Sequence, residues 1–206
     1  MQVLKATRKN IAVASEVVRS GGLVVYPTET VYGLGCDPLN IEAVKRVFRV
    51  KGDRKKPLPI LASSIEHIEK VTYLSKSVKS VTARFWPGPL TLVVSKKPFL
   101  PDIVTCNQDS VGVRIPNHDV AIRLIQLSDG LLVGTSANKA GRKPPKTAEE
   151  AIKQIGEEVD VILDGGPASF GTSSTVIDFT SAKPRLLREG PISLKEILDV
   201  FSLRQS

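Results

Sequence analysis

The hydrophobic and polar positions of the chain alternate between the period of helices and that of short strands. Between residues 11 and 18 the apolar residues recur at helical spacing, and the predicted helix ends at Gly21 and Gly22. The apolar run that follows predicts a strand ending at Pro27. Asn40 can cap a second helix, for which we expect a buried apolar face made of Ile41, Val44, Val47 and Phe48.

Further apolar runs, each short and several separated by helical stretches, also predict strands. They cover residues 58–62, 90–94, 111–115, 131–135, 159–163, 174–179 and 184–189. Two S/T-x-x-E capping boxes, Thr147 with Glu150 and Ser193 with Glu196, mark further helix starts. From residue 159 onward the strands follow one another too closely for helical crossovers, so part of the sheet should be antiparallel.

The order of these elements predicts an α/β fold with a twisted mixed sheet and helices packed on it. No long linker, repeat or low-complexity segment divides the sequence, so we expect residues 1–206 to form a single domain. The Pro- and Lys-rich stretch 139–146 is too short to tether two domains, and we interpret it as a mobile, functional loop.

Composition adds a broad class and a preferred kind of partner. The 206 residues are 41% hydrophobic and 24% charged, which is typical of globular proteins. No run approaches the roughly 20 apolar residues of a membrane span, and the N-terminus lacks the apolar segment of a secretory signal. We therefore expect a cytoplasmic protein without membrane association. The formal net charge of +8 favours polyanionic partners such as nucleotides or RNA.

Several familiar sites are not signalled by the sequence. Cys36, Cys106, His67 and His118 have no metal-ligand spacing, so we expect structural cysteines, surface or capping histidines, and no protein-built metal site. Residues 166–173 have the glycine spacing of a P-loop, but Thr172 replaces the required lysine. If the protein handles ATP, it therefore uses a less common kind of site.

Two segments in the first third of the chain suggest ligand binding. In YPTETVYGLG (residues 26–35), backbone amides and Thr28 or Thr30 could hold a small polar ligand, or the hydroxyls could simply cap a turn. Between Lys45 and Lys56, seven positive residues accompany only Asp53. They could form a solvated basic face, or a loop fixed by glycine and proline that concentrates cations around a triphosphate.

A third segment, GTSANKAG (residues 134–141), follows a predicted strand. Its Ser136 and Asn138 suit hydrogen bonding to phosphate or ribose, although serine and asparagine after a strand are also common turn formers. In their order and spacing, the three segments together with GVRIP (112–116), DGGP…STVID (164–178) and LLREG (186–190) resemble the YrdC family of threonylcarbamoyl-AMP synthases. The resemblance covers nearly the whole chain and implies a partly open sheet with a basic cavity on its concave side, where ATP binds without a P-loop.

The resemblance also implies roles for individual residues. Thr30, Arg114 and Ser174 match contacts to L-threonine. The implied contacts to ATP are Lys51, Arg54, Lys56, Ser110, Ser136, Asn138 and Arg188, of which Lys51, Arg54, Ser136 and Asn138 are the implied catalytic residues. The family's K-x-R motif departs here, since Asp53 stands in place of its arginine and Arg54 follows one position later. Leu61 replaces a threonine-binding histidine of some members.

The implied reaction joins ATP, L-threonine and bicarbonate into threonylcarbamoyl-AMP and releases pyrophosphate, for threonylcarbamoyladenosine modification of tRNA. We expect Mg²⁺ to arrive with ATP, a downstream threonylcarbamoyl transferase to receive the product, and any tRNA binding to be weak. Two alternatives stay open: an RNA-binding module that uses the same basic face, and a divergent family member with another carbamoyl acceptor. The aromatic content of 5% leaves few stacking platforms for RNA bases.

Overall fold

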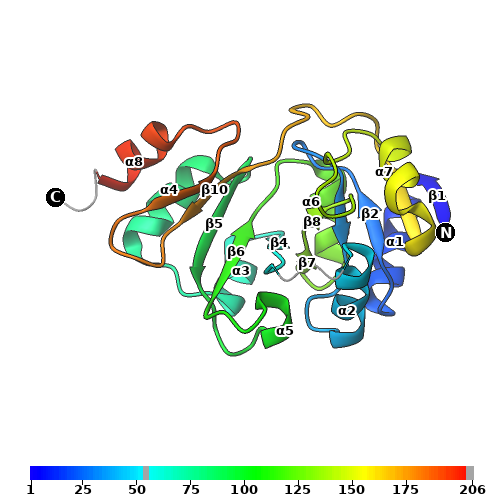
Figure 1. Cartoon of the computed structure of the whole chain (residues 1–206), viewed down its shortest axis with the longest axis horizontal. Coiled ribbons are helices and arrows are strands. Elements are labelled where there is room, and N and C mark those ends of the chain that lie inside the picture. The colour runs from blue at the N-terminus through cyan, green and yellow to red at the C-terminus, as the bar shows by residue number, and fades with distance from the viewer. Residues whose placement is uncertain (53–55, 203–206) are drawn as a thin grey trace.

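The computed structural model describes residues 1–52 and 56–202, whose strands form two mixed sheets. The first sheet has the strand order β1 (Gln2–Lys5), β9 (Val161–Asp164), β2 (Val24–Tyr26), β3 (Gly33–Gly35) and β8 (Thr135–Ser136). The second has the order β11 (Arg185–Arg188), β10 (Thr175–Asp178), β5 (Leu90–Ser95), β6 (Ser110–Arg114), β4 (Ile60–Ala62) and β7 (Leu131–Val133). In Figure 1 the first sheet lies on the side of the N-terminus and the second toward the C-terminus.

The α/β class and the mixture of parallel and antiparallel strands are confirmed, whereas the prediction of one sheet is corrected to two. The predicted strand 131–135 is divided at Gly134: β7 pairs with β4 in the second sheet, and β8 pairs with β3 in the first. A Cβ atom at Gly134 would lie 2.3 Å from Cγ of Leu61, so only glycine fits where the chain passes from one sheet to the other. Periodicity cannot reveal such a division, because β8 has only two residues, too few to show a period.

The late strands are partly antiparallel, as predicted. β10 pairs antiparallel with β11 but parallel with β5, and β9 is parallel to both β1 and β2. Because β9 and β10 belong to different sheets, the short connection between them does not need to form a crossover.

Eight α-helices within the described residues pack around the sheets: α1 (Arg8–Arg19), α2 (Ile41–Val50), α3 (Ile65–Val71), α4 (Lys76–Phe85), α5 (Asp102–Thr105), α6 (Asp119–Leu127), α7 (Ala148–Ile155) and α8 (Leu194–Ser202). Asn40 caps α2 as predicted, with its side chain accepting from the backbone N–H of Ala43. Before α8, Ser193 and Glu196 exchange the hydrogen bonds of a full capping box. Thr147 caps α7, but Glu150 reaches back to the N–H of Lys146 instead.

The predicted face of α2 is correct in its centre and wrong at its start. Val44 and Val47 are buried, and the buried stripe continues through Ala43 and Val50. Ile41 lies on the other side of the helix and is 49% exposed. The apolar pattern therefore included Ile41, at the start of α2, in a buried face to which it does not belong.

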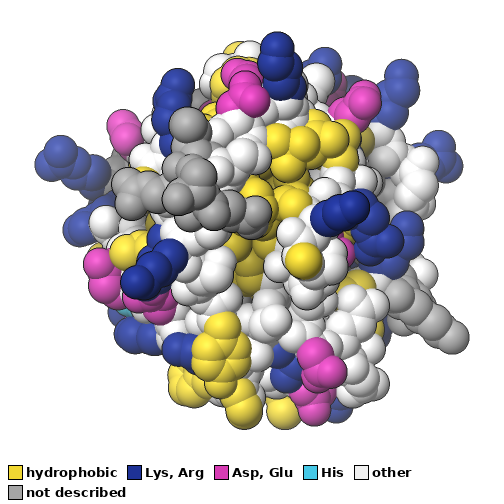
Figure 2. Space-filling model, turned by 90° about the vertical axis from the view of Figure 1, so that its left-hand side faces the viewer, with side chains coloured by type: hydrophobic (Ala, Val, Ile, Leu, Met, Phe, Trp, Pro, Cys, Tyr) yellow, Lys and Arg dark blue, Asp and Glu magenta, His cyan; other side chains and the backbone are white. Residues whose placement is uncertain are grey.

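The two sheets share one main hydrophobic core, to which the first contributes Val25 and Leu34 and the second Ile60 and Leu92. A smaller cluster lies under α1 and α6. On the face of the molecule at the α4 and α8 side, Lys and Arg side chains alternate with Asp and Glu around a central hydrophobic area (Figure 2). No helix in the described part of the chain is long and apolar enough to cross a membrane.

Candidate functional site

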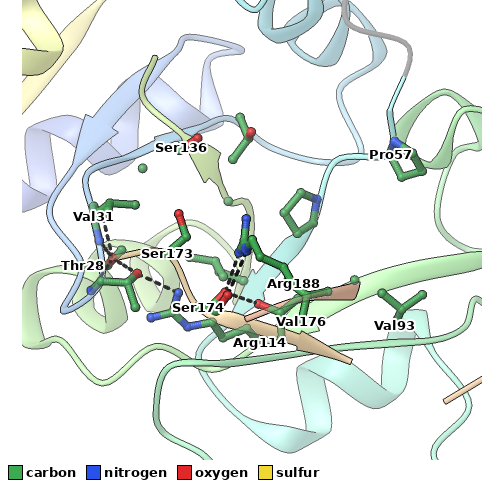
Figure 3. A pocket seen from close by; sticks show the side chains of 18 of the residues that line it. Thr28, Val31, Pro57, Val93, Arg114, Ser136, Ser173, Ser174, Val176 and Arg188 are labelled. Atoms are coloured by element: carbon green, nitrogen blue, oxygen red, sulfur yellow. Dashed lines mark hydrogen bonds between the residues drawn. The ribbon is translucent and has the colours of Figure 1, made fainter. Parts of the chain in front are cut away.

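A cavity of about 470 Å³ lies where the two sheets face each other, and side chains from both sheets line it (Figure 3). Most residues implied by the motifs are among its lining: Thr30, Lys56, Ser110, Arg114, Ser136, Ser174 and Arg188. Pro59, Leu61 and Val93 add apolar surface. The site thus combines apolar walls with convergent polar groups, as small-molecule sites commonly do.

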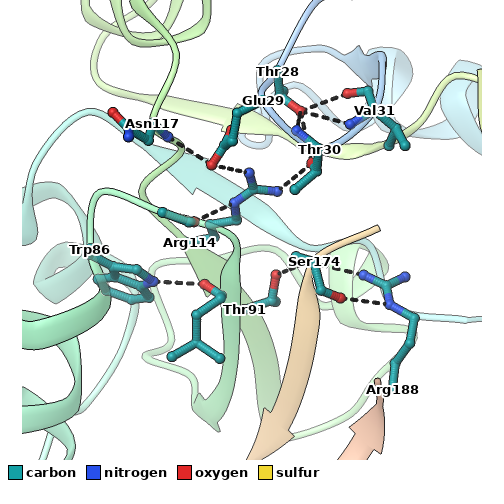
Figure 4. Close-up of polar contacts among 12 residues, drawn as sticks. Thr28, Glu29, Thr30, Val31, Trp86, Thr91, Arg114, Asn117, Ser174 and Arg188 are labelled. Carbon is teal, nitrogen blue, oxygen red and sulfur yellow. Dashed lines mark hydrogen bonds and ion pairs between the residues drawn. The ribbon is translucent and has the colours of Figure 1, made fainter. Parts of the chain in front are cut away.

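Arg114 is the most firmly held charge in the cavity. It ends β6 and is 5% exposed. Its Nε donates to the carbonyl of Gly88 at 2.9 Å and its Nη1 to Oγ1 of Thr30 at 3.0 Å. Its Nη2 forms an ion pair with Oε1 of Glu29 at 2.7 Å (Figure 4). Three contacts on one planar group fix the direction of the guanidinium.

The Thr28–Thr30 segment serves both as a turn and as part of the cavity. Oγ1 of Thr28 donates to the carbonyl of Val31 and accepts from the N–H groups of Thr30 and Val31. Because the single hydroxyl proton of Thr28 is used in this way, Thr30 is the donor in the 2.9 Å contact between the two hydroxyls. Thr28 therefore caps the turn, and Thr30 presents its oxygen to Arg114.

On the second sheet, Ser174 is the meeting point of a smaller polar cluster. Its Oγ lies 2.8 Å from Oγ1 of Thr91 and accepts from Nη2 of Arg188 at 3.0 Å (Figure 4). Nε of Arg188 donates to the backbone carbonyl of Ser174 at 2.9 Å. Ser174 is 4% exposed, whereas Arg188 is an exposed residue. One arginine of the cavity is therefore enclosed and the other faces solvent.

Lys51 and Asn138 are not among the residues that line the cavity. Lys51 is 1% exposed, and its Nζ donates to the carbonyls of Ser136 at 2.6 Å and of Asn138 at 2.5 Å. Nδ2 of Asn138 donates to the carbonyls of Lys139 and Arg142. Both side chains hold the loop that carries Ser136, so they support the cavity wall without lining it. Arg54 lies outside the described residues.

The charged residues of the cavity lining are all cationic within the described part of the chain: Lys56, Arg114 and Arg188. No group of three or more His, Cys, Asp or Glu residues that could hold a metal occurs among residues 1–52 and 56–202. The donor set therefore suits an anionic ligand, and a divalent cation would have to be held largely by that ligand.

The cysteines and histidines lie outside this lining. Cys36 is buried, and burial raises the pKa of its thiol. The N-cap of α3 is Ser64, whose hydroxyl accepts from the backbone N–H of His67 and lies 3.0 Å from its Nδ1, so the His67 side chain contacts the cap without supplying it. His118 stands at the N-cap of α6, but its side chain makes no cap hydrogen bond there. Partial burial lowers the pKa of its imidazole.

The sequence reasoning did not single out Glu29 and Thr91, which contact Arg114 and Ser174. Glu29 lies inside the YPTETVYGLG segment. A carboxylate within an otherwise uncharged, mostly apolar segment signals a buried partner, because an unpaired buried charge is costly. Thr91 gives no such signal, since a threonine in a strand is ordinary.

Comparison with known proteins places the chain in a family. The family model Sua5/YciO/YrdC, described as "Telomere recombination", matches residues 16–190. Threonylcarbamoyl-AMP synthase of Pyrococcus abyssi is 41% identical over 93% of this chain and 57% of its own length. The Thiobacillus denitrificans enzyme of the same name is 38% identical over 81% of this chain and 89% of its own length.

The same relationship appears among solved structures. The crystal structure of P. abyssi Sua5 complexed with L-threonine superposes with a TM-score of 0.94 at 38% identity, covering 97% of this chain and 61% of that one. This chain thus spans about three fifths of the length of its Pyrococcus relatives. From the match to most of its sequence and from this superposition, the chain belongs to the Sua5/YciO/YrdC family.

Proposed function

We propose that this protein uses ATP to activate L-threonine and bicarbonate as threonylcarbamoyl-AMP, with release of pyrophosphate. The observation that carries the proposal is the enclosed Arg114 at the wall of a cavity whose described charged lining residues are all cations. Two homologues with 38–41% identity carry the name threonylcarbamoyl-AMP synthase. A structural neighbour with the same fold is described as a complex with L-threonine.

We assign the carboxylate of L-threonine to Arg114. A guanidinium has five N–H donors, and its contacts with Gly88 and Thr30 use two of them. Nη2 is a buried atom that faces Oε1 of Glu29 at 2.7 Å, so the ion pair occupies it. We therefore assign the second N–H of Nη1 to the substrate carboxylate. We assign Thr30 and Ser174 to the other polar groups of the amino acid.

The nucleotide is assigned to the more open part of the cavity. Lys56 and Arg188 supply positive charge for the phosphates, and Ser110 and Ser136 supply hydroxyl groups. Lys51 and Asn138 would act on ATP through the position of Ser136, whose carbonyl Lys51 binds. The role proposed for Arg54 remains a prediction.

The chemistry requires positioning and charge neutralisation more than proton transfer. The amine of threonine and bicarbonate give a carbamate and water. An oxygen of the carbamate attacks the α-phosphorus, forming a new P–O bond while the bond to the β-phosphate breaks and pyrophosphate leaves. Cations that face the developing charge lower the barrier. Mg²⁺, entering with ATP, would neutralise phosphate charge.

Pyrophosphate release from ATP tests the proposal. We expect release to require L-threonine and bicarbonate together, because the acyl group transferred to AMP contains both. The control replaces L-threonine by L-valine, which has no hydroxyl for Thr30 or Ser174 to bind. Equal release without L-threonine, from protein free of contaminating ATPase, contradicts the proposal. Release with another amine in its place favours a family member with a different carbamoyl acceptor.

The product would pass to a downstream threonylcarbamoyl transferase for tRNA modification. We expect direct tRNA binding to be weak and steeply salt-dependent, because Lys and Arg contacts to phosphate dominate where stacking residues are few. Sequence-specific binding that survives high salt, in a protein that releases no pyrophosphate, supports the RNA-binding module instead.

A further inference from the structure

The buried ion pair between Glu29 and Arg114 joins the two sheets at the cavity. Arg114 ends β6 of the second sheet, and Glu29 lies in the segment between β2 and β3 of the first. The exposed fraction of each side chain is 6%. Figure 4 shows Arg114 reaching from its strand toward Glu29 and Thr30 on the opposite segment.

Glu29 is itself held from several directions. Its Oε1 accepts from the backbone N–H of Asn117 at 2.9 Å, and its backbone carbonyl accepts from Phe170 at 2.8 Å. Its Oε2 is buried without a hydrogen-bond partner in the described residues. The charge of Glu29 is therefore compensated chiefly by Arg114.

We propose that Glu29 is a positioning residue that sets the direction in which Nη1 of Arg114 presents its second N–H to the ligand carboxylate. The inference rests on the function proposed above. Nε and Nη1 contact neutral oxygens, whereas Nη2 is attracted to a charged one. The contacts of Nε and Nη1 still allow the guanidinium plane to tilt at Nη2. The ion pair with Glu29 prevents this tilt. Without Glu29 the guanidinium would keep its charge and lose this orientation.

An opposite expectation follows from charge alone. A carboxylate 2.7 Å from Arg114 competes electrostatically with an incoming carboxylate, so its removal could strengthen threonine binding. The two ideas predict opposite changes in the affinity for L-threonine. The direction of the change is measurable in one variant, Glu29→Gln, which keeps the size and the polar end of the side chain but removes its charge.

The experiment measures Kd for L-threonine and for ATP separately by calorimetry, together with Tm, in wild type, Glu29→Gln and Glu29→Asp. We expect Kd for L-threonine to rise roughly tenfold or more in Glu29→Gln, as for loss of an oriented bond to a charged group. Kd for ATP should stay within about twofold. Glu29→Asp keeps the charge but shortens the side chain, so it should fold and show an intermediate rise. Glu42→Gln, which removes an exposed carboxylate paired with Lys45 on α2, is the matched control and should change neither Kd.

Three outcomes overturn the inference. The first is an affinity for L-threonine that is unchanged or increased in Glu29→Gln. The second is a parallel loss of both affinities with a large fall in Tm in both Glu29 variants, which would make Glu29 merely structural. The third is an equal effect of Glu42→Gln. If the wild-type protein binds no L-threonine, the proposed function itself is contradicted. If the wild type binds L-threonine and Glu29→Gln binds it equally well, only the role of Glu29 is contradicted.

Discussion

The two arginines of the cavity are held in different ways. Arg114 is 5% exposed and bonds to three different residues, one of them a buried carboxylate. Arg188 is exposed, and its Nε and Nη2 donate to the carbonyl and the hydroxyl of Ser174. A charge fixed before the ligand arrives costs little to organise on binding, whereas an exposed one must be ordered at that moment. Under the proposed function, Arg114 would therefore supply selective recognition and Arg188 an adaptable charge.

Substitution of Arg114 should give the largest effect. Arg114→Met keeps most of the apolar volume but leaves the Glu29 carboxylate buried without its cation, which typically costs about 3–5 kcal/mol of unfolding free energy. We expect a loss of that order in urea denaturation and no measurable threonine-dependent pyrophosphate release. The double variant Glu29→Gln/Arg114→Met should recover much of the stability but none of the activity. Wild-type stability in Arg114→Met would show that the pair is less enclosed than its 6% exposure indicates.

Lys51 extends the comparison to a buried cation that does not line the cavity. Lys51→Met leaves the carbonyls of Ser136 and Asn138 without their charged donor, although the Ser136 carbonyl still accepts from the N–H of Asn138. Loss of a hydrogen bond to a charged group costs about 1.5–3 kcal/mol. Because the same loop carries Ser136, we expect weaker ATP binding along with reduced unfolding free energy. Lys45→Met on the exposed side of α2 is the control. A variant that folds as stably as wild type but loses ATP binding would instead indicate direct contact of Lys51 with phosphate.

Arg188→Ala should affect binding more than stability. Its side chain is exposed but donates two hydrogen bonds to Ser174, so the free energy of unfolding should fall by about 1 kcal/mol. Loss of a cation beside the phosphates should raise Kd for ATP roughly tenfold, with a smaller change for L-threonine. Calorimetric titration with each ligand measures the two changes in Kd. A larger effect on L-threonine would mean that Arg188 acts through Ser174, whose hydroxyl it contacts.

The strands and many residues of the cavity lining were predictable from the sequence. The run 90–94 gave β5 (Leu90–Ser95) to within one residue, because buried strands are continuous apolar runs. Two strands were missed. β1 is mostly exposed and has no apolar run. β3 is Gly33–Gly35, which appears as a turn in sequence, although a Cβ at either glycine would lie 2.8 Å from the ring of Tyr26.

The missed parts of the site are long-range pairings of charge. Arg114, Thr30 and Ser174 belong to recognisable motifs, and the structure brings them to one cavity. The pairing of Glu29 with Arg114 joins two motifs that are far apart in sequence, and only the approach of the two sheets creates it. Lys51 belongs to a strongly basic segment that suggests an exposed charge. Its burial follows from carbonyls of a loop more than eighty residues later in the chain.

The smallest expected effect is a difference in how strongly salt weakens the binding of the two ligands. Raising the ionic strength from about 0.1 M to about 1 M shortens the Debye length from about 10 Å to about 3 Å, which screens exposed charges much more than enclosed ones. Kd for ATP should therefore rise several-fold more than Kd for L-threonine. Arg188→Ala should flatten the response for ATP, because it removes one of the exposed cations, whereas Glu42→Gln should leave it unchanged. Equal salt sensitivity for both ligands would mean that solvent reaches Arg114 as readily as Arg188, and that the two arginines do not differ in the way their burial indicates.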